Sequence, residues 1–448
     1  MAEADTLLGE VQATDGVATN GGGFDPGVVS PGTDHAYAGT TFARADLVID
    51  GADNTKITSA GDPFAADDNG NRIQITAGTG FTPGFYTIKA VAAGVAELDR
   101  ACGTVGSTGG TGGIGPLDIL TAAYINASPA GITIWVKNNG TMTLGGSING
   151  TADGAMALPC AVIGYNATRG DNPTGTDRPL IAQGAYYWIL DDYWRRQNLR
   201  ITLTEETGVR SDTGGHFVNC SINNSSETAG RVAMKLSGYA MMVDGCDVQS
   251  INGHGIVHPG GHFGQVIRNS YVHDCGDAGI NMSTNATVTI EHCIIEAIGE
   301  AGIQFTTGSG VTIEQCTING CVDGIDLGDV QDARVRNNII SHCTTVGAKA
   351  NAASARHVFD YNNWHGNTAD VSNVTKGANA TAVDPAFVGA DDFRTPSGSG
   401  VRDAANGIAD GVGAASTPDQ GAWQSAGAGG AAGGYMPYTK RHGLQGVT

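Results

Sequence analysis

The sequence has few charged residues, and most of them are acidic. Asp, Glu, Lys and Arg make up 15 % of the 448 residues, against about 25 % in ordinary domains. With 24 basic and 44 acidic side chains, the formal net charge is −20. A nucleic-acid groove needs clustered Lys and Arg, and anionic membrane surfaces attract basic segments. The charge therefore argues against both nucleic acid and membrane as partners.

Long apolar runs and strong helix formers are also scarce. No stretch approaches the roughly 18 apolar residues of a membrane-spanning helix, and the opening MAEADTLLGE lacks the basic and apolar regions of a secretory signal. We therefore expect synthesis and assembly in a cytoplasm. The 69 glycines are about twice the usual share, and Thr, Val, Ile and Asn are plentiful. This composition favours strands and turns over helices.

A repeat of 22 to 26 residues runs through the second half of the chain. The stretch VTIEQCTINGCVDGIDLGD (311–329) reads like VTIEHCIIEAIGEAGIQF (288–305). A self-similar period in this range is the signature of a solenoid. Aligning the cysteines gives one equivalent position per repeat, occupied by Cys220, Cys246, Ser270, Cys293, Cys316, Asn338 and Asn362.

Two further positions recur in step with the first. Five residues later stand Ile251, Cys275, Ile298, Cys321 and Cys343. A glycine followed by a small or apolar residue comes next, in Gly255-Ile256, Gly279-Ile280, Gly302-Ile303, Gly324-Ile325 and Gly347-Ala348. We expect these glycines to mark a bend, because a backbone without Cβ adopts positive φ readily.

The pattern inside a repeat is that of short strands. Val311 and Ile313 alternate with Thr312 and Glu314, which is a period of two. Ile318 lies five residues beyond Ile313, so a corner must fall between them. A coil of this length built from short strands predicts a right-handed parallel β-helix, in which stacking lays Ile on Ile and Cys on Cys in one core.

The repeated cysteine allows three interpretations: a metal site, a disulfide ladder or stacked thiols. Zinc needs four converging ligands, typically with C-x2-C spacing, which is absent. A disulfide ladder would be interrupted by Ser270 and Asn338, and nine cysteines cannot all pair. Free cysteine behaves as a small hydrophobe. We therefore interpret the ladder as reduced structural thiols, and expect no metal and no cofactor.

The flanks of the repeat divide the chain further, and the predicted fold class is all-β throughout. Five short alternating runs between 41 and 102 indicate a small antiparallel β-domain. The Gly-rich stretch 103–115 has the composition of a flexible linker. The predicted order is an extended anchoring arm (1–40), the small β-domain (41–102), the linker (103–115), the β-helix with a polar end cap at 383–400 (116–400), and a Gly/Ala-rich C-terminal segment and arm (401–448).

Carboxylates on the late coils are the first candidates for chemistry. Asp323 and Asp326 lie within one coil, and glycoside hydrolysis needs two carboxylates about 5 to 9.5 Å apart. The alternative is a solvated acidic face, because the sequence fixes no base beside them. His254, His258 and His262 are spaced by four residues, but the surrounding Gly and Pro predict a loop, so this spacing implies no common metal-binding side.

Aromatic and arginine side chains gather in AYYWILDDYWRRQ (185–197). Exposed aromatics can stack on sugar rings, and Arg can clamp a carboxylate. Strand alternation would instead turn about half of them toward the core. The candidates for glycan contact are Tyr186, Tyr187, Trp188, Tyr193, Trp194, Arg195 and Arg196.

The coils from 216 to 366 resemble the pectate-lyase-like right-handed parallel β-helix superfamily. VATNGGGFDPGVVSPGTD (17–34), the 41–102 segment with GTGFTPGFYTIKAV, and GYNATRGDNPTGTDRPLI (164–181) are similar to virion proteins of tailed bacteriophages. The resemblance implies a capsid decoration, head fibre or tail spike, a class that is commonly trimeric and often binds glycans. The lyase motif does not map onto this chain, and GHG at 253–255 lacks its hydrolase partners, so no catalytic residue is carried over.

We therefore expect a non-catalytic structural protein on the surface of a phage particle. Its expected partners are other virion proteins, further copies of the chain (a trimer being favoured), and a surface glycan. The alternatives are a polysaccharide lyase or glycoside hydrolase, and a glycan-binding adhesin. A groove lined by carboxylates and a base would favour an enzyme, whereas exposed aromatics without a carboxylate pair would favour an adhesin.

Overall fold

The computed structural model describes residues 8–20, 22–23, 42–204, 208–283, 287–354, 356–389, 393, 395 and 401. Most of the two predicted arms, at 24–40 and 402–448, lies outside these residues. The chain divides into two compact units, Met1–Thr202 and Leu203–Thr448. The described helices are one α-helix, α1 (Ala122–Asn126), and the 3-10 turns η1 (Ala66–Asp68) and η2 (Gly175–Asp177). Within the described residues no helix has the length and apolarity needed to cross a membrane.

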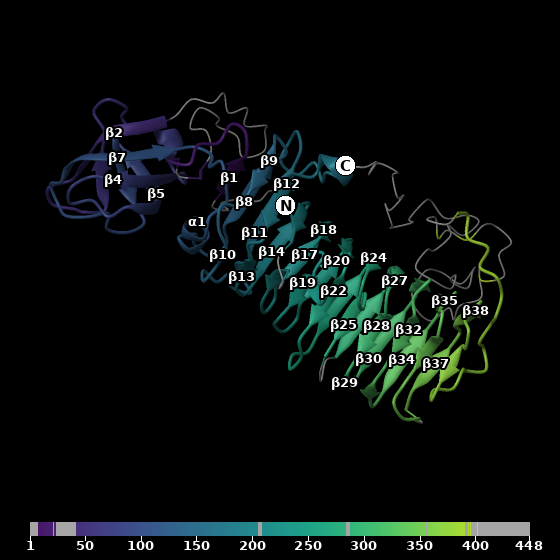
Figure 1. Cartoon of the computed structure of the whole chain (residues 1–448). Helices are drawn as coiled ribbons and strands as arrows, with labels where there is room; N and C mark the ends of the chain where they lie inside the picture. Colours follow the sequence, from purple (N-terminus) through teal and green to yellow (C-terminus); the bar gives the residue numbers. More distant parts are fainter. Residues whose placement is uncertain are drawn as a thin grey trace, which may run out of the picture. The chain divides into compact units, whose positions relative to one another are not determined.

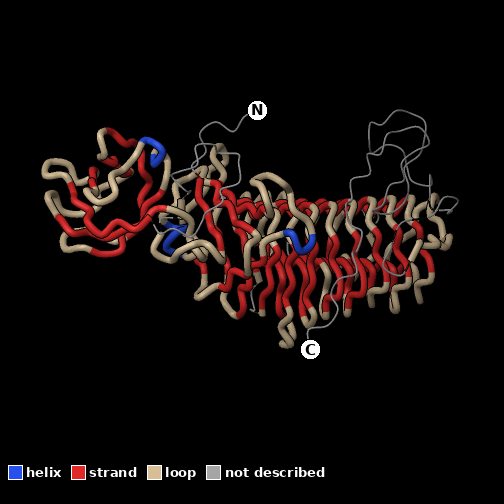
Figure 2. Tube along the Cα trace, turned by 90° about the horizontal axis from the view of Figure 1, so that it is seen from above, coloured by secondary structure: helices blue, strands red, loops and turns tan. Residues whose placement is uncertain are grey.

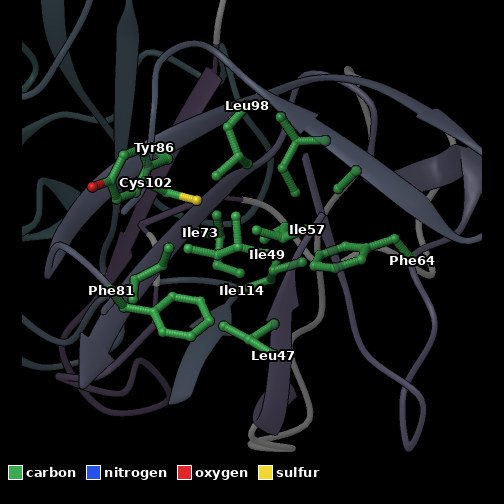
Figure 3. Packing of buried hydrophobic residues seen from close by; sticks show 13 residues of the cluster. Leu47, Ile49, Ile57, Phe64, Ile73, Phe81, Tyr86, Leu98, Cys102 and Ile114 are labelled. Carbon is green, nitrogen blue, oxygen red and sulfur yellow. The ribbon is translucent and has the colours of Figure 1, made fainter. Parts of the chain in front are cut away.

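The first unit contains a closed antiparallel barrel (Figure 1). All five runs predicted between 41 and 102 form strands, as expected for a small antiparallel β-domain. The barrel order is β2 (Phe42–Ile49), β3 (Lys56–Thr58), β6 (Val95–Leu98), β5 (Gly84–Ala92), β4 (Arg72–Ala77) and β7 (Thr108–Ile114). Figure 3 shows the apolar side chains that fill it, among them Leu47, Ile49, Ile73 and Phe81.

The sixth barrel strand corrects the predicted linker. Residues 103–115 were expected to be flexible, but Thr108–Ile114 forms β7, which pairs with β2 and β4. Its glycines are needed for packing: a Cβ on Gly110 would lie 2.5 Å from the Phe81 ring, and one on Gly112 would lie 2.6 Å from the Gln74 carbonyl oxygen. Composition alone does not distinguish a glycine that gives flexibility from one that allows close approach.

The rest of the first unit consists of wider coils of parallel strands. β1 (Leu8–Gln12) pairs with β8 (Thr133–Lys137), so part of the predicted anchoring arm is a strand. Parallel pairs also join β9 (Thr141–Thr143) to β12 (Leu180–Gly184), β10 (Ile148–Asn149) to β13 (Trp188–Leu190), and β8 through β11 (Cys160–Tyr165) to β14 (Trp194–Gln197). β15 (Arg200–Leu203) spans the division between the units.

The second unit is a parallel β-helix of three sheets, as predicted (Figures 1 and 2). The first sheet is β17 (His216–Val218), β20 (Met242–Asp244), β23 (Gln265–Arg268), β26 (Val288–Glu291), β30 (Val311–Glu314), β34 (Ala333–Arg336) and β37 (Val358–Asp360). The second sheet is β18 (Ser221–Asn224), β21 (Asp247–Ser250), β24 (Tyr271–Cys275), β27 (Ile294–Ile298), β31 (Thr317–Asn319), β35 (Ile339–Ser341) and β38 (Asn363–His365). The third sheet is β16 (Val209–Ser211), β19 (Arg231–Leu236), β22 (Gly253–His258), β25 (Ile280–Met282), β28 (Ala301–Phe305), β32 (Asp323–Asp326), β36 (Val346–Lys349) and β39 (Val371–Ser372). Beside the third sheet, β29 (Thr307–Gly308) pairs with β33 (Asp329–Val330).

The predicted corner between Ile313 and Ile318 is present and recurs in every coil. The residue before each ladder position has positive φ, and most of these residues are not glycine: they are Asn219, Gly245, Asn269, His292, Gln315, Asn337 and Tyr361. A second corner, between the second and third sheets, uses Asp274, Ala297, Gly320, His342 and Gly366 in the same way. Every one of these coils therefore turns once through a left-handed residue, and the five later coils do so twice.

The repeated Gly-Ile pairs do not form these bends, so the prediction for them is wrong. The glycines lie in or beside the third sheet without positive φ, and they stack on one another. A Cβ on Gly302 would lie 2.8 Å from the Gly324 carbonyl oxygen, and one on Gly324 would lie 2.3 Å from that of Gly347. The same added Cβ on Gly324 would lie 3.0 Å from Cys343 Sγ. Close approach to the neighbouring coil and the sulfur core, rather than φ, requires glycine here.

The ladder position bridges successive coils. All nine cysteines are buried, and none forms a disulfide. The Cys316 thiol donates to the Ile290 carbonyl at 3.6 Å, and the Asn338 amide donates to the Ile313 carbonyl at 3.0 Å. Cys, Ser and Asn share the position because each is small and can donate a hydrogen bond. The second ladder is less regular, since a bulge places Ser250 opposite Cys275 and leaves Ile251 48 % exposed.

The segment after the last coil differs from the predicted polar cap. Residues 376–383 lie along the final coil, where Lys376 bridges to Phe359 and Thr381 bridges to Asn363. Phe387 and Phe393 pack against Tyr271 of β24 and Ile294 of β27. The end of the solenoid is thus covered a few residues earlier than expected, and Phe387 and Phe393 add apolar contacts to the second sheet.

Candidate functional site

The predicted carboxylate pair lies on the third sheet with a lysine between its members. Lys349 of β36 places Nζ 2.6 Å from Asp323 Oδ2 and 3.2 Å from Asp326 Oδ2, both on β32. The register sets this geometry, because Asp326 pairs directly with Lys349. Asp323 is buried, with 9 % of its surface exposed. Sequence analysis found the carboxylates but missed the lysine, which comes from the next coil.

The charge of this cluster is internally balanced. Partial burial lowers the pKa of Lys349, but the hydrogen bonds and charges of Asp323 and Asp326 outweigh it, so the pKa lies above its usual value. The ammonium therefore stays protonated at neutral pH. A lysine that acts as a general base needs the opposite shift, toward pH 7. The cluster is arranged as an ion pair and not as an acid–base couple.

The structure separates the predicted aromatic and arginine candidates. Tyr186 and Tyr187, between β12 and β13, are 41 % and 38 % exposed. Trp188, Trp194 and Arg196 are fully buried, so the prediction that they contact a glycan is wrong. Strand alternation turns these three inward, and the Arg196 guanidinium lies 5.2 Å from the centre of the Trp188 ring system.

The remaining two candidates, Tyr193 and Arg195, are partly exposed. Tyr193 has a φ of 59° and begins the turn into β14. Together with Tyr186 and Tyr187, these residues are the part of the candidate group that a ligand can reach.

An exposed aromatic cluster lies elsewhere, on loops that lead from the third sheet to the first. Tyr239 follows β19, while His262 and Phe263 follow β22 in the next coil. Tyr239 and Phe263 are 46 % and 51 % exposed. The Tyr239 ring lies 4.5 Å from the His262 ring and 6.5 Å from the Phe263 ring. The spacing of 24 residues between Tyr239 and Phe263 equals one coil, and this was the signal in the sequence that could have identified the cluster.

The histidine run is ordered rather than loop-like. Gly253–His258 forms β22, and only His262 lies in a loop. The glycines again allow close packing, since a Cβ on Gly253 would lie 1.9 Å from the Arg231 carbonyl oxygen. Burial, and to a smaller extent the neighbouring His262, lower the pKa of His258 to about 4. In the described residues no group of three or more His, Cys, Asp or Glu side chains is placed to hold a metal ion.

A second charged cluster lies on the second sheet. His273 Nε2 is 2.9 Å from Asp247 Oδ1, and Nδ1 is 2.7 Å from Asp274 Oδ2. The imidazole stacks on Tyr271 with ring centres 4.2 Å apart. Burial lowers the pKa of His273, but the two carboxylates outweigh it and raise the pKa to about 9. The ring is therefore an imidazolium at neutral pH, held between two acids.

Comparison with known proteins supports the fold. Residues 230–387 match the family described as right handed beta helix region. No curated protein matches the chain in sequence. The match covers the coils of the second unit that carry the Asp323–Asp326–Lys349 cluster and the exposed aromatic cluster.

Several solved structures share the architecture at low identity. Pectate lyase Pel9A is 15 % identical with a TM-score of 0.49, covering 69 % of this chain and 91 % of that one. An alginate lyase from Paenibacillus is 14 % identical with a TM-score of 0.30, covering 59 % and 98 %. A tailspike protein from a Pseudomonas phage is 11 % identical with a TM-score of 0.23, covering 78 % and 64 %. Structures this distant carry no functional argument for this chain. The family match at 230–387 supports a right-handed β-helix.

Proposed function

We propose that the chain is a non-catalytic structural protein displayed on the surface of a phage particle, where its exposed aromatic side chains contact a glycan. One observation carries the proposal: the carboxylate pair of the late coils is neutralised by Lys349, which lies 2.6 Å and 3.2 Å from its two members. A hydrolase needs one protonated and one ionised carboxyl group facing the substrate. Here both carboxylates bind the same cation.

Glycan contact is supported by the aromatic cluster of Tyr239, His262 and Phe263. The exposed rings of Tyr239 and Phe263 come from two adjacent coils, have their centres 6.5 Å apart and offer apolar faces side by side. Monomeric proteins rarely expose grouped apolar side chains without an interaction partner. Sugar rings present C–H faces that suit such a surface, and their hydroxyl groups remain in water.

Display on a particle is supported by the similarity of 17–34, 41–102 and 164–181 to phage virion proteins. The stacked coils provide a stiff scaffold, as expected for a projecting component.

We also propose that the protein assembles as a homotrimer and contacts other virion proteins. Imaging of labelled particles tests the location, and light scattering of purified protein tests the stoichiometry. A free monomer with no label on particles would contradict both.

The non-catalytic part is tested by incubating the full chain with a panel of neutral and acidic polysaccharides. Reducing ends report hydrolysis, and ultraviolet absorbance of unsaturated sugars reports elimination. We expect no turnover. Turnover that disappears in Asp323→Asn and in Lys349→Met would identify an enzyme and overturn the proposal.

Glycan contact is tested separately, by affinity electrophoresis with the same panel. Tyr239→Ala with Phe263→Ala is expected to abolish retardation by the bound polysaccharide. Met156→Ala is the matched control, because Met156 is 80 % exposed and lies in the other unit. Equal retardation of both variants would show that the cluster is not the contact surface.

A further inference from the structure

A basic pocket lies on the first sheet of the second unit, outside both clusters described above. It has a volume of about 340 Å³, within the range of small-ligand pockets. Three arginines line it: Arg334 and Arg336 from β34, and Arg356 from the loop before β37. Asp332 is the one acidic residue in its lining. A chain with a net charge of −20 thus places three of its 24 basic residues around one cavity.

The three guanidinium groups differ in how firmly ion pairs with neighbouring carboxylates fix them. Arg334 Nε lies 2.7 Å from Glu314 Oε1, which fixes one edge of its fork. Arg356 lies 3.4 Å from Asp332 Oδ2, but its side chain is 68 % exposed, and exposed pairs of this kind contribute little. The Gly310 amide donates a hydrogen bond to Asp332 Oδ1 at 2.7 Å and so fixes the position of that carboxylate.

Of the three arginines, Arg336 is the one whose guanidinium has the least complete hydrogen bonding. By register it lies between Glu314 and Asp360 of the neighbouring strands. Yet its Nε is buried and, among the described residues, has no hydrogen-bond partner. A buried donor without an acceptor costs free energy, and an incoming oxyanion would remove this cost.

We propose that this pocket binds an oxyanion, a carboxylate or a sulfate ester, carried by an acidic polysaccharide. Planar guanidinium groups bind such anions through two parallel hydrogen bonds. The backbone row beside the arginines supplies the neutral remainder of the site: Thr312 and Val358 flank Arg334 on the adjacent strands and line the same cavity. This inference rests on the proposed glycan contact and names the chemical class of the glycan.

Nucleic acid and acidic proteins fit the molecule less well. The pocket is local, and the remaining acidic surface of the chain repels a long polyanion that carries a charge on every unit. A polysaccharide with its charges on separated rings can place one anion among the arginines and keep uncharged hydroxyls elsewhere. Its affinity should fall as salt screens the ion pairs.

The test measures the affinity of the full chain by calorimetry for four polymers: hyaluronate, which carries a carboxylate on every second ring, sparsely sulfated dextran, neutral dextran and poly-L-glutamate. We expect at least one of the two acidic polysaccharides to bind more tightly than dextran and poly-L-glutamate. Whichever of the two acidic polysaccharides binds more tightly shows whether the pocket prefers a carboxylate or a sulfate ester. Arg336→Gln should weaken that binding roughly 10- to 100-fold. Arg334→Lys keeps the charge but removes the fork, so it should weaken binding less than Arg334→Gln.

Arg268→Gln is the matched control. Arg268 lies on the same sheet and is paired with Asp244 at 2.9 Å, but it does not line the pocket. Its replacement should leave affinity unchanged, and thermal unfolding checks that each variant is folded. Equal binding in Arg336→Gln and Arg268→Gln, or equally tight binding of poly-L-glutamate, would overturn the inference.

Failure of the proposed function gives a different pattern. Dextran binding that depends on Tyr239 and Phe263, with no effect of Arg336→Gln, would retain the glycan contact and refute the acidic pocket. Cleavage of a bound acidic polysaccharide would refute the non-catalytic role and retain the pocket. Absence of any polysaccharide binding would refute both.

Discussion

At the scale of single residues, the coils depend on small side chains placed where two backbones meet. A Cβ added to Gly255, Gly302 or Gly324 would meet a carbonyl oxygen of the next coil on one side and a cysteine sulfur on the other. The left-handed corners have a different requirement, because Asn, His, Gln and Tyr occupy them as well as glycine. A residue with positive φ costs about 1–2 kcal/mol of conformational free energy for most residue types and less for Asn. The coils tolerate this cost because it falls on one residue at each such corner.

Replacing Gly324 with alanine is expected to lower the free energy of unfolding by about 1–3 kcal/mol. The added Cβ would lie 2.3 Å from the Gly347 carbonyl oxygen, which cannot move without disturbing the next coil. Gly145→Ala is the control, because nothing lies within 4 Å of its added Cβ. Urea unfolding of both variants measures the difference. An unchanged midpoint for Gly324→Ala would mean that the coils are less tightly stacked than described.

The ionised His273 predicts a pH dependence of stability. Its folded pKa of about 9 is above the ordinary value of 6.5. A raised pKa contributes stability that is full below about pH 6.5 and is lost as the pH rises through about 9. We expect wild-type protein to lose on the order of 3 kcal/mol at most across this window. His273→Gln should remove that slope, and NMR titration of the imidazole should give the midpoint directly. A midpoint near 6.5 would contradict the ion-paired geometry.

At the scale of elements, the ladder shows how different side chains serve one position. Cys316 and Asn338 both donate to a carbonyl of the preceding coil, but Asn338 also accepts the Cys316 backbone amide at 2.8 Å. Ser270 accepts the Cys246 amide at 3.2 Å in the same way. The position selects for small size and hydrogen bonding together, which explains why it is not purely apolar.

Asn338→Ala is therefore expected to destabilise the protein by about 2–4 kcal/mol, because the buried Cys316 amide and Ile313 carbonyl both lose a partner. Asn338→Ser should cost less, since a hydroxyl at the equivalent position of another coil accepts the same kind of amide. Thermal unfolding compares the two. Equal losses would indicate that volume alone determines the effect.

The elements also show what the sequence can predict. The 22 to 26 residue period and the odd spacing between Ile313 and Ile318 were enough to predict coils, corners and a parallel solenoid. They were not enough to assign a role to glycine, since Gly110 and Gly324 allow contacts with residues distant in sequence. Nor could alternation tell which of Tyr187 and Trp188 faces solvent. The role of Lys349 could not be predicted either, because its partners, Asp323 and Asp326, lie on the neighbouring coil and are distant in sequence.

At the scale of the whole molecule, nine buried thiols report on the folded state of both units. Burial raises the pKa of Cys102 to about 11, and that of Cys275 and Cys343 to about 12. Only the thiolate reacts with alkylating reagents, and only when it is reached. The structure therefore keeps these side chains both protonated and covered.

We expect the native protein to resist iodoacetamide at pH 8, and the urea-unfolded protein to be labelled at all nine cysteines. Mass spectrometry of intact protein counts the modifications. Rapid labelling of Cys102 alone would indicate local opening of the barrel. Rapid labelling of Cys293 and Cys316 would be inconsistent with a continuous core in the coils.

Residues 376–383 have a consequence for assembly. Parallel strands stacked in register form the same ladder that grows without limit in a fibril, where each exposed edge templates the next chain. The bridges from Lys376 to Phe359 and from Thr381 to Asn363 occupy the edge that the last coil would otherwise present. By covering the outer edges of β37 and β38, this short segment reduces the surface onto which another copy could polymerise.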